Sequence, residues 1–154
     1  MKYARNAGFT LVELLITVTI ASIVVAMAVP SFHETVRGHQ VRSTANDFYS
    51  LIRYARAEAM RRGSVVEVAP LENDDWATGA IARTADGTEL RRISSSGTLI
   101  IQEQNGLNAI VFNGKGYLQT PVNLIVRREQ ADRPARLISI LQSGFAWNSE
   151  VEGS

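Results

Sequence analysis

Three short stretches of this chain hold residue types that support catalysis or metal binding in other proteins. His33, Glu34 and His39 lie close together, but their spacing is not the H-E-x-x-H of zinc hydrolases. The stretch "NGKG" at residues 113–116 lacks the remaining glycine and the Ser or Thr of a phosphate-binding loop. The acidic pair at residues 74–75 lacks the other regularly spaced oxygen ligands of a calcium loop. None of the three stretches predicts a catalytic or metal site.

Composition excludes further classes of site. The chain has no cysteine, so it has no thiol nucleophile, disulfide or thiolate metal site, and no serine lies in a G-x-S-x-G motif. The 16 basic and 15 acidic residues almost balance, so no overall positive field attracts nucleic acid. We therefore expect no enzyme activity, no cofactor and no metal.

The remaining unusual residue is Glu13, the one charge in the apolar run from residue 8 to residue 30. The segment from Phe9 to Val29 is about 30 Å long as a helix, which suits a membrane anchor. Lys2 and Arg5 before the run also suit a cleaved secretory signal. Neither reading explains Glu13, because a carboxylate at mid-membrane costs about 2.5–3.5 kcal/mol.

Cleavage between Gly8 and Phe9 would explain the carboxylate. It would give Phe9 a free amino group, and Glu13 lies four residues later, about one helical turn away. There it could pair with that amine or with the amine of a neighbouring chain. The positive end of the helix dipole also favours an acidic residue in the first turns.

The stretch "GFTLVELLITVTI" resembles the type IV prepilin signature, with Gly before the scissile bond, an aromatic residue after it, and a Glu in the apolar run. Pro30 matches the proline that commonly kinks pilin helices. The resemblance implies that a prepilin peptidase cuts after Gly8, that Phe9 is N-methylated, and that Glu13 neutralises an adjacent subunit's amino terminus during assembly. It also implies that Lys2 and Arg5 stay on the cytoplasmic side of the inner membrane.

A second pattern extends the helix beyond the apolar run. Apolar residues recur at alternating steps of four and three, which indicates one stripe of an amphipathic helix. Gly63 is a suitable C-terminal cap. We therefore predict one long N-terminal helix whose later part packs on a globular head. The residues of the predicted stripe are Val41, Ala45, Phe48, Ile52, Ala55 and Ala59.

After Gly63 the pattern changes to strands. Asp86-Gly87 and Asn105-Gly106 each lie between β-branched runs and predict two hairpins. The runs "VNLIVRRE" and "ARLISILQ" follow, and the tail "NSEVEGS" is expected to be frayed. One helix followed by strands alone predicts an α+β fold, a pilin-like helix packed on an antiparallel β-sheet head. The expected segments are a leader (1–8), a transmembrane and filament-core helix (9–30), its amphipathic continuation (31–63) and a β-rich head (64–154).

The head is similar to the GspH/FimT group of minor pilins and pseudopilins. A Tyr-Ala-Arg-x-Glu-Ala core stands at residues 54–59, and a Phe-x-x-x-Gly turn runs from Phe112 to Gly116. The resemblance implies a subunit anchored in the inner membrane that joins a filament. Its partners would be the prepilin peptidase, other minor and major pilins, and the assembly platform. Tyr54, Trp76 and Phe112 are expected to pack in the core.

DNA is the alternative partner. Some members of the group bind DNA through a Gly-Arg-x-Arg tract, where this chain reads "SGFAW" from Ser143 to Trp147. Phe145 and Trp147 replace the arginines and cannot neutralise phosphates, so the resemblance does not favour DNA. The two rings suit either a protein partner or closure of the core. The nearest cations, which would contact DNA if the head bound it, are Arg127, Arg128, Arg133 and Arg136.

Three functions remain open. The first is a minor pilin of the initiation or tip complex of a type IV pilus. The second is a pseudopilin of a type II secretion system, and the third is a DNA-binding minor pilin of natural transformation.

Overall fold

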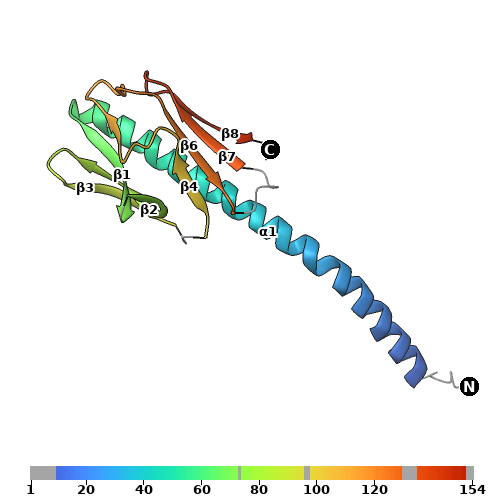
Figure 1. Cartoon of the computed structure of the whole chain (residues 1–154). Helices are drawn as coiled ribbons and strands as arrows, with labels where there is room; N and C mark the ends of the chain where they lie inside the picture. The colour runs from blue at the N-terminus through green and yellow to red at the C-terminus, as the bar shows by residue number, and fades with distance from the viewer. Residues whose placement is uncertain (1–9, 73, 96–97, 130–134, 152–154) are drawn as a thin grey trace, which may run out of the picture. The chain divides into compact units, whose positions relative to one another are not determined.

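An α-helix, α1 (Leu11–Arg62), begins the described part of the chain (Figure 1). The computed structural model describes residues 10–72, 74–95, 98–129 and 135–151, and for residues 27–37 it describes the backbone alone. A boundary between two compact units falls after Arg37, within the span of α1. Among the described residues, no helical run combines the length and the apolar character that a membrane crossing requires.

The end of α1 follows the pattern expected at Gly63. Gly63 has a φ of 64°, and the backbone N–H of Ser64 donates to the carbonyl of Ala59 over 3.2 Å. This is the hydrogen bond of a Schellman cap, in which glycine adopts the left-handed conformation at little cost. The cap ends the helix and turns the chain into the first strand.

Eight strands follow the helix and form two four-stranded antiparallel sheets (Figure 1). The first sheet has the order β3-β2-β1-β5 and the second has the order β4-β6-β7-β8. The expected α+β fold is therefore confirmed. The strands are β1 (Val66–Glu72), β2 (Asp75–Thr84), β3 (Glu89–Ser94), β4 (Ile100–Glu103), β5 (Ile110–Phe112), β6 (Val122–Arg127), β7 (Ala135–Ile140) and β8 (Ala146–Val151).

One apolar core joins the later part of α1 to both sheets. All six residues of the predicted helical stripe are buried, as is Leu51 beside them. Trp76 of β2 is 4% exposed and its ring lies 6.4 Å from that of Phe48. Phe112 is fully buried and Tyr54 packs at the edge of the core, so the three aromatic residues expected there are confirmed in place.

The hairpin predictions have opposite outcomes. Asp86-Gly87 does connect β2 to β3, which pair antiparallel. The prediction at Asn105-Gly106 was wrong: β4 pairs with β6, and β5 pairs with β1 in the other sheet. The turn at residues 104–109 therefore carries the chain from one sheet to the other.

The C-terminal tail also differs from expectation. Residues 148–151 were expected to be frayed, but they form most of β8 and pair with β7 from Ala135 to Ile140. Because β7 offers an unpaired edge, even the polar sequence "NSEV" finds backbone hydrogen-bond partners there. The tail thus completes the second sheet and fixes the position of Trp147.

Candidate assembly and partner-binding sites

Glu13 lies in the first turn of α1, where it forms a reciprocal capping box with Thr10. The Thr10 backbone N–H and hydroxyl each donate to Glu13 Oε2 over 3.0 Å, and the Glu13 backbone N–H donates to Thr10 Oγ1 over 3.2 Å. Both groups are exposed, and the arrangement satisfies backbone donors that a helix start otherwise leaves open. Gly8 and Phe9 lie outside the described residues, so pairing of Glu13 with an amine stays a prediction.

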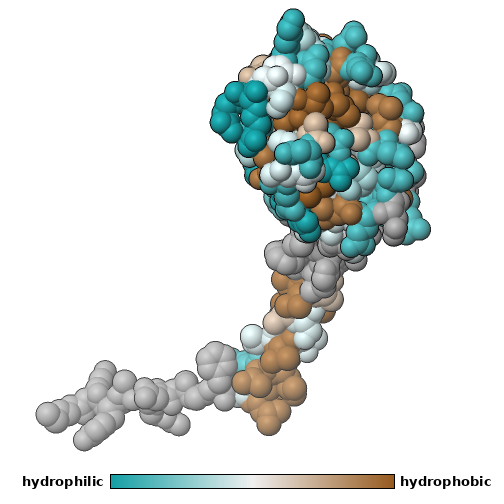
Figure 2. All heavy atoms as spheres, turned by 90° about the vertical axis from the view of Figure 1, so that its left-hand side faces the viewer, coloured by the Kyte–Doolittle hydropathy of each residue, from teal (hydrophilic) through white to brown (hydrophobic). Residues whose placement is uncertain are grey.

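The turns that follow Glu13 present an apolar surface on all sides. Large aliphatic side chains between residues 11 and 25 are more than half exposed, up to 75% for Leu11, and appear brown in Figure 2. The hydroxyls of Thr17, Thr19 and Ser22 each donate over 2.7 Å to the carbonyl four residues earlier. These internal bonds leave the polar atoms satisfied without water. Pro30 also lies within α1, but its side chain is outside the described part.

The second candidate site lies at the turn between β7 and β8. Phe145 is 59% exposed and Trp147 is 38% exposed, and their ring centroids are 6.2 Å apart. Ala146 between them is buried, so the two rings project from the same side of the chain. The rings do not close the core, which leaves a partner contact as the remaining interpretation.

Arg56 of α1 holds this turn in place. Its Nε donates to the carbonyl of Gly116 over 3.2 Å, and its Nη2 donates to the carbonyl of Ser143 over 2.9 Å. The Phe112–Gly116 turn and the β7–β8 turn are thereby joined to the same helical residue. Gly144 has a φ of 78°, and a Cβ there would lie 2.0 Å from the Gly116 carbonyl oxygen. Only glycine fits this junction.

Two residues later, Glu58 forms a second cluster on the same helix. It is 8% exposed and receives hydrogen bonds from Arg61 over 2.6 and 2.8 Å and from Arg62 over 2.6 Å. These bonds, Arg61's first, lower the pKa of Glu58 from 4.5 to about 2. Arg56 and Glu58, two members of the core motif at residues 54–59, therefore secure turns and the helix end.

A groove of about 420 Å³ lies between α1 and the β7–β8 turn. Tyr49, Arg53 and Met60 line it from the helix, and Phe145 lines it from the turn. The hydroxyl of Tyr49 donates to the carbonyl of Ala146 over 3.3 Å, which fixes one end of the groove. The groove is continuous with the exposed aromatic pair because Phe145 belongs to both.

The arginines considered for DNA do not form one surface. Arg136 is opposite Val126 in the β6–β7 register, so it lies on the buried face of the sheet. There it pairs with Glu150 over 3.6 Å. Arg127 follows Val126 and therefore lies on the opposite face. Arg128 comes directly after β6, and Arg133 lies outside the described residues.

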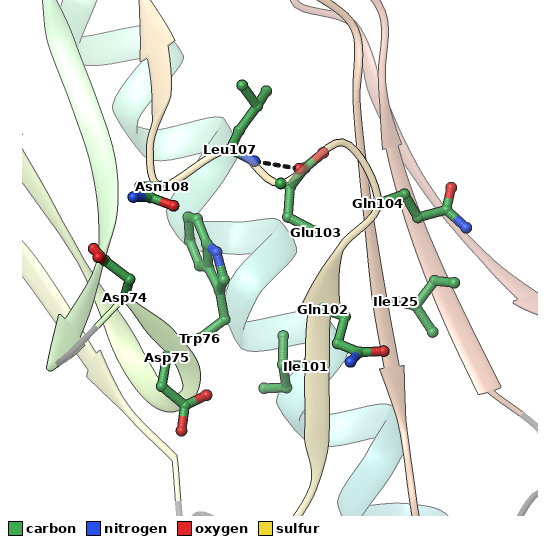
Figure 3. A pocket seen from close by; sticks show the side chains of 11 residues that line it. Asp74, Asp75, Trp76, Ile101, Gln102, Glu103, Gln104, Leu107, Asn108 and Ile125 are labelled. Carbon is green, nitrogen blue, oxygen red and sulfur yellow. Dashed lines mark hydrogen bonds between the residues drawn. The ribbon is translucent and has the colours of Figure 1, made fainter.

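A pocket of about 580 Å³ lies between β2 and the loop after β4 (Figure 3). Asp74 and Asp75 stand on one side, and Trp76 projects toward Glu103 and Asn108 on the other. Glu103 Oε2 accepts backbone N–H bonds from Asn105 over 2.8 Å and Leu107 over 2.7 Å. Glu103 thus anchors the chain that crosses between the sheets, a role in the fold.

Comparison with known proteins identifies this arrangement. The family model for the type II transport protein GspH matches residues 44–144, about two thirds of the chain. The chain belongs to the GspH family. Residues 3–29 match the prokaryotic N-terminal methylation motif, a span that includes Gly8, Phe9 and Glu13. Together the two matches confirm a type IV pilin-like protein of the GspH/FimT group.

Solved structures share the fold of this GspH-family chain. Two crystal structures of the type IV minor pilin FimU from Pseudomonas aeruginosa PAO1 match with TM-scores of 0.65 and 0.62, at 23% and 24% sequence identity. The first match covers 72% of this chain and 89% of that one; the second covers 70% and 91%. No curated protein sequence shows significant similarity to the chain.

Membership in the GspH family implies a prepilin-type membrane anchor, processing of the leader by a peptidase, and contacts with other pilin-like subunits. The GspH match ends at Gly144, so Phe145 and Trp147 lie directly beyond it. Arg56 and the β7–β8 turn fall within it. The GspH-type scaffold therefore presents an aromatic pair that lies outside the family match.

Proposed function

We propose that this chain is a minor pilin of a type IV pilus that acts in the initiation or tip complex of the filament. The observation that carries the proposal is the exposed pair of Phe145 and Trp147 on a head whose chain begins with a prepilin motif. Exposed aromatic residues beside each other are favoured at the centre of protein interfaces. The proposed role is structural and involves no catalysis by this chain.

In this proposal the subunit is first a single-pass protein of the inner membrane, with its head in the periplasm. A prepilin peptidase cuts between Gly8 and Phe9, and Phe9 is methylated. The assembly platform then moves the subunit into a filament with other minor and major pilins, where Glu13 pairs with a neighbour's amino terminus. The apolar surface of α1 supports this role, because its hydroxyls already have partners.

The decisive test is surface piliation in a strain that lacks this gene alone, measured by shearing and electron microscopy. Loss of pili that the wild-type gene restores is the expected result. Complementation with the double substitution Phe145→Ala and Trp147→Ala should restore few pili. The matched control is Val111→Ala, because Val111 is similarly exposed on β5, in the other sheet. Normal piliation of the deletion strain would refute the proposal.

A type II secretion pseudopilin is the second candidate, because the matching family is described as a type II transport protein. Secretion of a known substrate of that system, measured in the same deletion strain, separates the two candidates. Loss of secretion with normal pili would establish the second. DNA binding is not favoured, because Arg127 and Arg136 lie on opposite faces of the sheet.

A further inference from the structure

The groove between α1 and the β7–β8 turn combines exposed apolar walls with positive charge. Phe145 forms one wall, and Met60, which is 47% exposed, forms the other. Both are large apolar side chains that water surrounds in the isolated subunit. Burying them against another chain is favourable, by roughly 25 cal/mol for each Å² of apolar surface.

The charge in the groove comes from Arg53 and Arg56, and no residue that lines it is acidic. Both acceptors of Arg56 are neutral backbone carbonyls, so its charge is not neutralised by these bonds. The guanidinium of Arg53 is exposed and lies 5.6 Å from the centre of the Tyr49 ring. The ring holds the guanidinium at the groove and leaves its charge in place. The nearest carboxylate along this part of α1, Glu58, already pairs with Arg61 and Arg62.

From this arrangement we infer that the groove receives a segment of a partner subunit that presents a carboxylate beside a large apolar side chain. Arg53 binds the carboxylate, and Phe145 and Met60 bury the apolar neighbour. The inference rests on the proposed function, since it names the chemistry of the partner surface that the aromatic pair contacts. Guanidinium and carboxylate match in geometry as well as charge, which gives such a contact direction.

Duplex DNA fits the same groove poorly. A duplex presents one phosphate charge for about every 1.7 Å of its axis, and proteins that bind it use several cations in a row. Here Arg56 is held back by Gly116 and Ser143, and Arg53 alone stands exposed at the groove. A space of about 420 Å³ suits a few side chains of a peptide segment.

The test uses the full chain in its own cells, with a photoreactive amino acid in place of Met60. Crosslinked partners are identified by mass spectrometry, and the crosslinked segment is mapped to its residues. The same measurement is made with Arg53→Gln and Arg53→Glu. Arg42→Glu is the matched control, because Arg42 is an exposed arginine three helical turns earlier on a similar face of α1 and does not line the groove.

We expect a crosslink to a pilin-like subunit, in a segment with Asp or Glu beside an apolar residue. Arg53→Glu should reduce its yield roughly five- to tenfold, because it replaces attraction by repulsion at a partly exposed pair. Arg42→Glu should leave the yield unchanged. Changing the mapped carboxylate of the partner to Lys should restore the crosslink to the Arg53→Glu chain.

Four results would overturn the inference: a mapped segment without a carboxylate, a crosslink to nucleic acid, no crosslink, or equal losses from Arg53→Glu and Arg42→Glu. Piliation separates this failure from that of the proposed function. If the deletion strain lacks pili but Arg53→Glu forms them normally, the groove inference fails and the minor-pilin proposal stands. If the deletion strain is fully piliated, the minor-pilin proposal fails, whatever the crosslink shows.

Discussion

Arg56 in the helix and Ser143 in the last turn of the head are 87 residues apart in sequence, yet one hydrogen bond of 2.9 Å joins them. Through this bond the helix determines where the β7–β8 turn lies, and therefore where Phe145 points. The orientation of an exposed, partner-facing ring thus depends on a residue that is partly buried beneath it.

Replacing Arg56 by Lys should weaken the head by about 1–2 kcal/mol, because one ammonium group cannot reproduce two bonds made by a planar guanidinium. Thermal unfolding of the full chain in detergent measures the loss. Arg53→Lys is the control, since Arg53 contacts the Tyr49 ring and supports neither turn. Equal melting temperatures for the two variants would contradict the role given to Arg56.

Gly144→Ala should be more destabilising than Gly87→Ala. Both glycines have positive φ, 78° and 86°, so each substitution costs about 1–2 kcal/mol in backbone strain. The space around Gly87 is open within 4 Å, whereas a Cβ at Gly144 meets the Gly116 carbonyl oxygen at 2.0 Å. Overpacking should add about 1–3 kcal/mol at Gly144 alone. Chemical denaturation compares the two variants, and equal losses would show that the junction can relax.

Glu58 should make stability depend on pH in the acid range. Its hydrogen bonds to Arg61 and Arg62 lower its pKa in the folded state from 4.5 to about 2. The resulting stabilisation is fully present above pH 4.5 and is lost as the pH falls from 4.5 toward 2. Melting temperatures measured across this window should fall less steeply for Glu58→Gln than for the wild type. Parallel curves would mean that the ion pairs contribute nothing.

Thr10→Val should loosen the first turn of α1, because it removes the hydroxyl that both donates to Glu13 and accepts from its N–H. Loss of such a cap costs about 0.5–2 kcal/mol. Hydrogen exchange of the backbone amides of residues 11–14 in detergent should become faster in Thr10→Val and stay slow in Thr10→Ser. Thr19→Val is the control, since it removes a hydroxyl bond within the helix but no cap.

Local patterns predicted the elements of this fold well and their partners less well. The stripe from Val41 to Ala59 and the turn at Asp86-Gly87 are local features, and both were confirmed. Asn105-Gly106 has the same turn chemistry as Asp86-Gly87, but a turn motif cannot tell whether the next strand joins the same sheet. That choice depends on β1 and β6, which lie far away in sequence.

The candidate site shows the same limit. The aromatic residues at 145 and 147 are visible in the sequence, but their exposure depends on β8 pairing with β7. Arg56 belongs to a motif that was recognised in the sequence. Its function was not predicted, because its acceptors, Gly116 and Ser143, are backbone atoms 60 and 87 residues away. A backbone acceptor leaves no signature in residue type.

The hydroxyls of Thr17, Thr19 and Ser22 have a consequence for how a subunit can be recycled. Since each is bonded within its own helix, the helix needs no hydrogen bond from whatever surrounds it. It can exchange lipid tails for neighbouring helices, and return, without breaking a polar contact at either end of the journey. Filament growth and retraction would then be nearly symmetric for this segment, and the direction would be set by the heads and by the motor that drives them.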